Sequence, residues 1–262
     1  MPDVVSPSLD QNRLIAALSP ADRQLVATVA RIVRLNSGTL LYEPGDIVGA
    51  AYLPLAEGVA TFHVLMEDGS AVETAMVGCE GVIGGLVSRG RLAAYARSCV
   101  MHGGYFARIE SGALETLKTN SPAIRDLLSR YADCLLAQIF QSVACNAVHN
   151  LDQRAAKWLS AAVDRTGTHR VAMTQEQFGS LLGIARSYAS RLIQRFKAEG
   201  LLDTRRGALV VLDAEGLRRR ACGCNDLVRA HFEQVLKDVY PDAAEACDGS
   251  GGRSRKTSTI DG

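Results

Sequence analysis

The sequence predicts an α+β chain in three parts: a β-rich N-terminal part, one long helix, and a smaller helical C-terminal part. Three observations predict this order. Short β-prone runs alternate with turn residues over about residues 33–109, an uninterrupted helical pattern follows from 121 to about 150, and two short helices separated by a glycine come after it. We place the parts at 1–120, 121–150 and 151–240, and we expect a disordered polar tail at 241–262.

The composition is that of a globular chain. Its 262 residues exceed what one ordinary domain needs, and 47% hydrophobic residues are enough for two cores. No apolar run approaches the roughly 18 residues of a membrane span, so we expect no membrane partner. The seven cysteines are irregularly spaced, which argues against a disulfide framework and favours a reducing compartment. We therefore expect a cytoplasmic protein.

The N-terminal part is predicted to be a β barrel preceded by helices. Apolar positions three and four apart predict two short helices over 9–35. Asp68-Gly69 lies between the β-prone runs 59–66 and 71–77 and is a strong hairpin signal. Many short strands at even spacing predict a closed or double-sheet β barrel, and we expect a β-roll of the double-stranded β-helix type.

The long helix is predicted to join two copies of the chain. Ser121 as N-cap and Pro122 at the first helical position open it, and nothing breaks it until near Asn150. A heptad-like row on this helix predicts a dimer seam, and a second apolar row is expected to face the barrel. The predicted seam residues are Leu128, Tyr131, Leu135, Gln138 and Ser142. A core helix with a polar end is the alternative.

The C-terminal part is basic, whereas the rest of the chain is acidic. Residues 168–220 carry ten Lys and Arg against five Asp and Glu, and the remaining residues carry 19 against 23. A net charge of +1 therefore hides a basic domain on an acidic body. This asymmetry is typical of nucleic-acid binders, although an ordinary solvated face also produces it.

Residues 174–199 have the pattern of a helix-turn-helix. Thr174 and Gln177 make a capping box, Gly183 ends the first helix, and the second begins at Ala185 or Arg186. A two-stranded wing with the basic tip 203–207 follows. We expect the outer face of the second helix to contact bases in the major groove and the wing to contact phosphate. The predicted DNA-binding residues are Thr174, Gln175, Arg186, Ser187, Ser190, Arg191, Gln194, Arg205 and Arg206.

In this order of parts the chain resembles the Crp/Fnr superfamily of bacterial transcription regulators. The resemblance is carried by 174–186, by the helix end 199–202, by the turn 42–46 and by 78–86, and it covers about residues 10–240. It implies a cyclic-nucleotide-binding-like β-roll, a homodimer on a palindromic operator in double-stranded DNA, and RNA polymerase as a further partner. It also assigns base contacts to Arg186, Ser187 and Arg191. Members with glutamate in place of Ser187 contact a cytosine amino group, so a different operator is expected.

The resemblance also implies an effector pocket in the barrel. Cyclic-AMP binders of this superfamily have Gly-Glu-Leu in their phosphate loop, where this chain has Gly84, Gly85 and Leu86, but Arg97 and Ser98 match the later Arg-Ser pair. We predict that these five residues, with Tyr131 and Gln138, hold an unidentified effector. Cyclic AMP is not expected, because the ribose would lack its carboxylate partner.

Fewer residues of the sequence support other classes of protein. A cupin-like metal-dependent enzyme, or a small-molecule-binding protein that does not use DNA, is the alternative to a regulator. Only His63 and His102 fall on barrel strands and no catalytic motif is present, so we predict no enzyme activity. No cysteine precedes Cys79, which argues against an iron–sulfur cluster of the superfamily's type.

We predict no metal site. The spacing of Cys222-Gly223-Cys224 is too short for a chelating pair, and we interpret it as structural. Cys145 and His149 lie four apart on the long helix and could meet their copies across a dimer to bind metal or sense oxidation, but plain packing is favoured.

Overall fold

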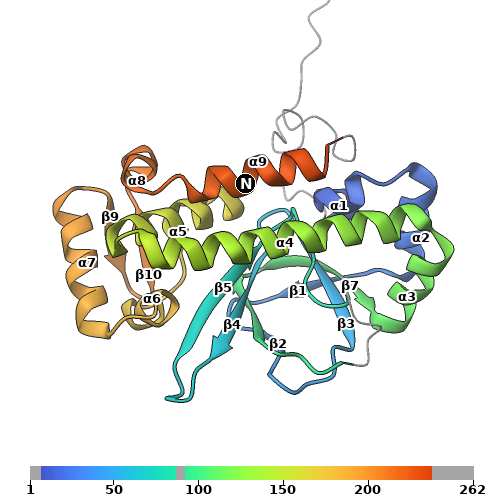
Figure 1. Cartoon of the computed structure of the whole chain (residues 1–262), viewed down its shortest axis with the longest axis horizontal. Helices are drawn as coiled ribbons and strands as arrows, with labels where there is room; N and C mark the ends of the chain where they lie inside the picture. The colour runs from blue at the N-terminus through green and yellow to red at the C-terminus, as the bar shows by residue number, and fades with distance from the viewer. Residues whose placement is uncertain (1–6, 87–91, 238–262) are drawn as a thin grey trace, which may run out of the picture.

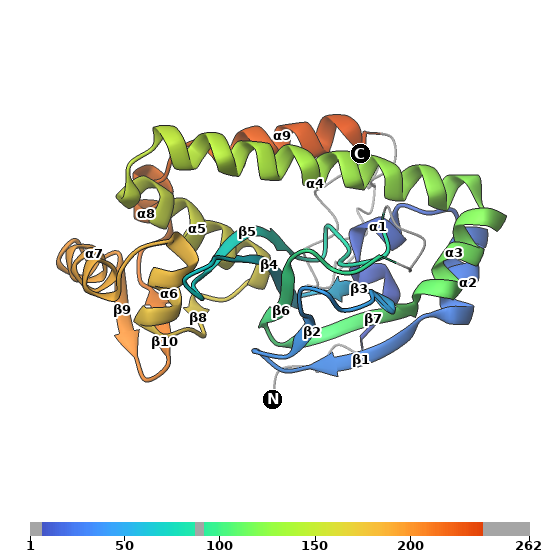
Figure 2. The same cartoon turned by 60° about the horizontal axis from the view of Figure 1, so that its bottom comes forward.

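The computed structural model describes residues 7–86 and 92–237, and the tail predicted at 241–262 lies outside them. Among the described residues, seven strands form the N-terminal barrel (Figures 1 and 2). They are β1 (Arg31–Leu35), β2 (Leu40–Tyr42), β3 (Ala50–Leu55), β4 (Val59–Leu65), β5 (Ala71–Val77), β6 (Arg97–His102) and β7 (Gly104–Glu110). One sheet has the order β1-β7-β3 and the other β2-β6-β4-β5, with antiparallel neighbours throughout. The predicted two-sheet barrel is confirmed.

The β4–β5 hairpin forms where the sequence predicts it. Gly69 takes the left-handed backbone conformation that the turn needs, with φ 81°, and Asp68 Oδ1 accepts a hydrogen bond from the Ser70 amide at 2.9 Å. The strands on either side pair from Ala60↔Val77 to Leu65↔Ala71. The hairpin therefore places β5 at the edge of its sheet.

The helical prediction for 9–35 is correct only in its first part. The chain forms a 3₁₀ turn η1 (Leu9–Gln11), α1 (Arg13–Ala16) and α2 (Pro20–Val29), but 31–35 is strand β1. β1 pairs with β7 from Arg31↔Arg108 to Leu35↔Gly104. The β-branched pair Ile32-Val33 suits a strand, and the partner strand that stabilises it lies about 70 residues away, beyond the reach of a local pattern.

The predicted long helix is present as α4 (Pro122–Val148), preceded by α3 (Ser111–Asn120). Ser121 caps α4, its Oγ accepting a hydrogen bond from the Ile124 amide at 3.1 Å. α4 crosses one side of the barrel and leads from α3 to the C-terminal domain (Figure 1). No helix among the described residues is long and apolar enough to span a membrane.

The C-terminal domain contains the predicted helix-turn-helix and wing. Its elements are α5 (Leu151–Thr166), β8 (Arg170–Val171), α6 (Gln175–Leu182), α7 (Arg186–Ala198), β9 (Leu202–Arg205), β10 (Ala208–Val211), α8 (Ala214–Arg220) and α9 (Cys224–Val235). The three strands form a sheet in the order β8-β10-β9. α9 then leaves the domain and runs back alongside α4 (Figures 1 and 2), where the rings of Phe232 and Tyr131 meet edge to face at 6.2 Å.

Candidate DNA-binding surface

The turn between α6 and α7 is built by local chemistry. Thr174 Oγ1 accepts from the Gln177 amide at 3.1 Å, and Gln177 Oε1 accepts from the Thr174 amide at 2.7 Å, which completes the predicted capping box. Gly183 ends α6 with φ 70°. A Cβ on Gly179 would lie 3.1 Å from Ala189 Cβ, so the small residue lets the two helices approach closely.

α7 buries one face and exposes the other. Ala189, Leu192, Ile193 and Phe196 are fully buried against the core of the domain. The predicted base-contacting residues lie on the opposite side: Arg186, Ser187, Arg191 and Gln194 are exposed and Ser190 is half-buried. α7 is on the outer side of the domain, away from the barrel (Figure 1). The described fold therefore leaves this face free to enter a groove of DNA.

Tyr188 belongs to the same face and was missed by the sequence analysis. Its side chain is exposed, and the Arg191 guanidinium carbon lies 5.1 Å from the centroid of its ring. The i, i+3 spacing of an aromatic residue and an arginine on the outer face was the signal that could have revealed it. Stacking on Tyr188 holds the Arg191 side chain in a defined direction.

The wing lies beside the start of α7. Gly207, with φ 68°, turns the chain between β9 and β10, and Arg205 and Arg206 are exposed at the tip. A cleft of about 410 Å³ separates the wing from the helix-turn-helix, and Thr174, Gln175, Arg186 and Arg205 all line it. Four of the nine predicted DNA-binding residues therefore surround one hollow, and the others lie on the adjoining surface.

The residues predicted for the effector pocket are dispersed. Arg97 Nε donates to both oxygens of Glu43, at 3.1 and 2.9 Å, and these hydrogen bonds raise the pKa of Arg97. Ser98 is fully buried and its Oγ has no hydrogen-bond partner. Gly84 lies against Ala50 and Tyr42, while Gly85 and Leu86 pack toward the core beneath α3. The effector role of these residues stays a prediction.

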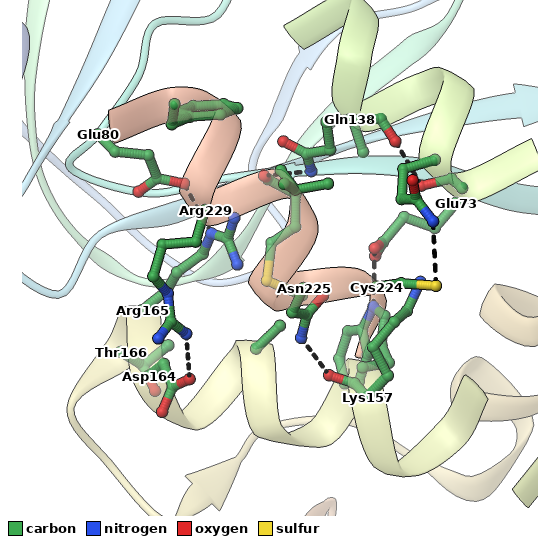
Figure 3. A pocket seen from close by; sticks show the side chains of 18 of the residues that line it. Glu73, Glu80, Gln138, Lys157, Asp164, Arg165, Thr166, Cys224, Asn225 and Arg229 are labelled. Carbon is green, nitrogen blue, oxygen red and sulfur yellow. Dashed lines mark hydrogen bonds and ion pairs between the residues drawn. The ribbon is translucent and has the colours of Figure 1, made fainter. Parts of the chain in front are cut away.

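A cavity of about 1020 Å³ lies instead between β5, α4, α5 and α9 (Figure 3). Of the seven residues predicted for the effector pocket, Gln138 is among those that line it, and its Nε2 donates to the Met76 carbonyl at 3.1 Å. Tyr131 does not line this cavity and is buried in the core between the barrel and α9. The cavity therefore lies between the barrel and the C-terminal domain.

Polar contacts at this cavity fix the C-terminal domain to the barrel. Arg165 on α5 pairs with Glu80 at 2.7 Å; burial opposes ionisation of Glu80, but the arginine outweighs it and holds the pKa of Glu80 below its ordinary value. Trp158 Nε1 donates to Glu73 Oε1 at 2.7 Å, and Ser180 Oγ donates to the Ala71 carbonyl at 3.0 Å. β5 and its following turn thus contact both α5 and α6.

The predicted dimer seam is wrong for Leu128 and Tyr131, which are buried in the core of their own chain. Leu135 packs on the barrel core, and Gln138 and Ser142 are half-buried on the same side. The heptad-like row faces this chain rather than a partner, because the barrel and α9 cover it. Large apolar side chains exposed on α4 lie at Leu136, Phe140, Val143 and Val148.

Comparisons with known proteins agree with this geometry. A sequence profile of the Crp-like helix-turn-helix domain matches residues 153–220. No curated protein matches the chain.

Solved structures share the fold at low identity. The c-di-GMP-responsive global regulator CLP of Xanthomonas campestris superposes with a TM-score of 0.60 and 16% identity over 74% of this chain and 100% of its own. FixK2 from Bradyrhizobium japonicum superposes with a TM-score of 0.61 and 16% identity, over 74% of this chain and 98% of its own. A transcriptional regulator of the CRP/FNR family from Thermus thermophilus superposes with a TM-score of 0.60 and 18% identity, over 73% of this chain and 98% of its own. Residues 153–220 thus form a domain of the Crp-like helix-turn-helix family, and the chain as a whole has the fold of Crp/Fnr regulators, in which a barrel and a long helix precede that domain.

Proposed function

We propose that this protein is a homodimeric, cytoplasmic transcription regulator that binds a two-fold symmetric DNA site under the control of a signal sensed by its barrel domain. The exposed face of α7 carries the proposal. It brings two arginines, two serines and a glutamine to one convex surface beside the basic wing. Side chains of these types pair with base edges in the major groove.

The two surfaces have different roles in this proposal. Arg186 and Arg191 donate to bases, most effectively to guanine O6 and N7. Arg205 and Arg206 at the wing tip contact phosphates and position the domain without selecting sequence. Arg186 also lies 4.0 Å from Glu176, with both side chains largely exposed, so little energy holds it away from DNA.

The dimer is proposed to form along the exposed face of α4. Leu136, Phe140 and Val143 are spaced by four and three residues, so they lie on one side of the helix, and Phe140 and Val143 are about two-thirds exposed. Pairing of α4 with its copy would cover this stripe. It would set two α7 helices about 34 Å apart, one turn of DNA, as a palindromic operator requires.

The signal is proposed to act through β5. The strand belongs to the barrel sheet and contacts α5 and α6, so a ligand that moves it changes the position of the DNA-binding domain. Among the described residues, the cluster of His, Cys, Asp and Glu placed to hold a metal lies at the end of α4 and not in the barrel. A cupin-like enzyme would need its ligands inside the barrel, so the regulator is favoured.

The test compares two arginines. Arg186→Ala removes a base contact and should cost about 1–3 kcal/mol on the preferred site, with relaxed selectivity at one position of each half-site. Arg205→Ala should weaken binding equally on specific and scrambled duplexes and reduce the salt dependence of affinity. Arg125→Ala, on the exposed face at the far end of α4, is the control and should change neither the affinity for DNA nor the selectivity between sites.

Binding curves on a selected site and a scrambled duplex, at two salt concentrations, separate these outcomes. If Arg186→Ala leaves the ratio of affinities for the specific and scrambled duplexes unchanged, α7 is not the element that contacts bases.

A further inference from the structure

Four potential metal ligands meet where α4 gives way to the DNA-binding domain. Cys145 lies in the last turn of α4 and His149 is its C-cap, while Cys222 follows α8 and Cys224 begins α9. The ligand atoms of all four lie within 4.8 Å of one another. From the sequence, plain packing is favoured for Cys145 and His149 over a meeting with their copies across a dimer, and Cys222 and Cys224 are interpreted as structural residues. The fold instead brings the two pairs together in one chain.

Two of the distances among these atoms match the edges of a tetrahedral site around one ion, and all of them are within 4.8 Å. Cys145 Sγ and Cys222 Sγ are 3.6 Å apart, and so are Cys224 Sγ and His149 Nδ1. Bond lengths of about 2.3 Å to sulfur and 2.0–2.1 Å to nitrogen give tetrahedral edges of about 3.8 Å between sulfurs and about 3.6 Å from sulfur to nitrogen. The two sulfurs are too far apart for a disulfide, whose bond is about 2.05 Å.

The surroundings are those of a closed site with a route of entry. The three cysteines are buried and form a cluster of their own, separate from the apolar cores. Gln141 Nε2 donates to Cys224 Sγ at 3.2 Å, the kind of hydrogen bond that stabilises a coordinating thiolate. Cys224 also lines the large cavity (Figure 3), through which an ion can reach the site.

We propose that Cys145, His149, Cys222 and Cys224 bind one Zn²⁺ as a structural site. Three cysteines and one histidine around a single point are a set that zinc uses in closed structural sites, and soft thiolates select zinc over magnesium, calcium or manganese. Coordination replaces the three thiol protons by the metal and leaves every cysteine reduced, so no oxidant is needed. An iron–sulfur cluster would spread its ligands over several irons, not around one point.

The site joins the two ends of the DNA-binding domain. The matched Crp-like segment, 153–220, lies entirely between the ligand pairs, since 145 and 149 precede it and 222 and 224 follow it. The ion would close a loop of 77 residues between Cys145 and Cys222 and hold α9 against α4. An effect of the metal site on DNA binding rests on the proposed function, whereas the existence of the site does not.

Metal content tests the site without DNA. The full chain is expressed in zinc-containing medium without a histidine tag, and zinc is measured by mass spectrometry. We expect one zinc per chain in the wild type and in Cys99→Ser, a half-buried cysteine of the barrel, and less than about a tenth of that in Cys222→Ser/Cys224→Ser. A wild type without zinc, which also fails to take up Zn²⁺ in competition with a chelator, overturns the proposal. Undiminished zinc in the double variant overturns it as well.

Cobalt substitution needs no variant and so avoids misfolding. Co²⁺ in the wild-type chain should give the intense visible bands of a tetrahedral ion together with thiolate-to-metal charge transfer. A weak octahedral spectrum without charge transfer, or a Cys145–Cys222 disulfide in protein purified in the presence of a thiol reductant, would contradict the assignment. Loss of DNA binding in Cys222→Ser/Cys224→Ser but not in Cys99→Ser would extend the site to regulation. A zinc-loaded protein that binds no DNA would refute the proposed function and leave the site intact.

Discussion

The burial of the Glu73 carboxyl group beside Trp158 makes the stability of this protein depend on pH. Glu73 lies on β5 and is half-buried as a residue, but its Oε2 is shielded from solvent and has no hydrogen-bond partner. Burial raises the pKa of Glu73 to about 8, against the opposing effects of the Trp158 hydrogen bond and the charges of Arg165 and Lys157. The folded chain therefore retains a proton that the unfolded chain loses at much lower pH.

The sign and the size of the pH effect on the free energy of unfolding follow from this difference in pKa between the folded and unfolded chains. Between pH 4.5 and about 8 the unfolded chain releases the proton and the folded chain keeps it, so the free energy of unfolding falls as pH rises. At about 1.4 kcal/mol per pH unit, the loss between pH 5 and pH 8 is up to about 4 kcal/mol. This is an upper limit, because separation of α5 from β5 would expose the carboxyl group and let it ionise at lower cost.

Glu73→Gln isolates this effect. The amide oxygen can still accept from Trp158 Nε1 and the side chain does not titrate, so the stability of the variant relative to wild type should rise steadily from pH 5 to pH 8. Denaturant unfolding is followed by the fluorescence of Trp158, the single tryptophan of the chain. Glu67→Gln, an exposed carboxylate next to the β4–β5 turn, is the control. A Glu73→Gln difference that stays within about 0.5 kcal/mol across this range would refute the reasoning.

Two further substitutions test the helix α4. Phe140→Asp places a charge in the exposed apolar stripe of α4 and should convert the dimer to a monomer in sedimentation. Ile47→Asp, at an equally exposed position on the barrel, is the control and should remain dimeric. If Phe140→Asp also remains dimeric, the dimer interface lies elsewhere. Gly81→Ala puts a Cβ in steric conflict with Tyr131 Oη, and because that ring is buried against Phe232 the free energy of unfolding should drop by about 1–3 kcal/mol. The helical Gly112→Ala, which has open space at its Cβ, should instead stabilise by about 0.5–1 kcal/mol, and equal effects of the two would contradict the packing argument.

Features set by neighbouring residues were predictable from the sequence. The Thr174 capping box, the Gly183 turn and the Asp68-Gly69 hairpin each depend on hydrogen bonds or backbone conformations within a few residues, and all three are present. The exposed face of α7 followed from the same local periodicity, because its apolar positions fix which side is buried.

Features set by distant segments were not predictable in the same way. The pattern of α4 predicts an apolar row at Leu128 and Tyr131 but cannot say whether a second copy or this chain covers it, and here α9 and the barrel do. The cysteine cluster joins residues 77 positions apart, so neither pair alone has the four ligands of a closed metal site. Strand β1 was assigned to a helix because its partner β7 was not visible in its own sequence.

The two sets of contacts around the DNA-binding domain differ in what a signal can change. The proposed zinc site and α9 join the domain to the end of α4, and the ligands lie at both ends of the Crp-like segment, so motion there would have to strain metal–ligand bonds. The contacts to β5 and the turn after it are single hydrogen bonds, the half-buried ion pair of Glu80 with Arg165, and the packing of Met76 into the core of the domain. Breaking such a pair leaves two poorly solvated charges, a cost that a ligand of the adjoining cavity with its own charge could offset. Under the proposed function, a signal would therefore be transmitted most readily by an exchange of contacts at β5, with the domain rotating about the end of α4 and carrying α7 with it.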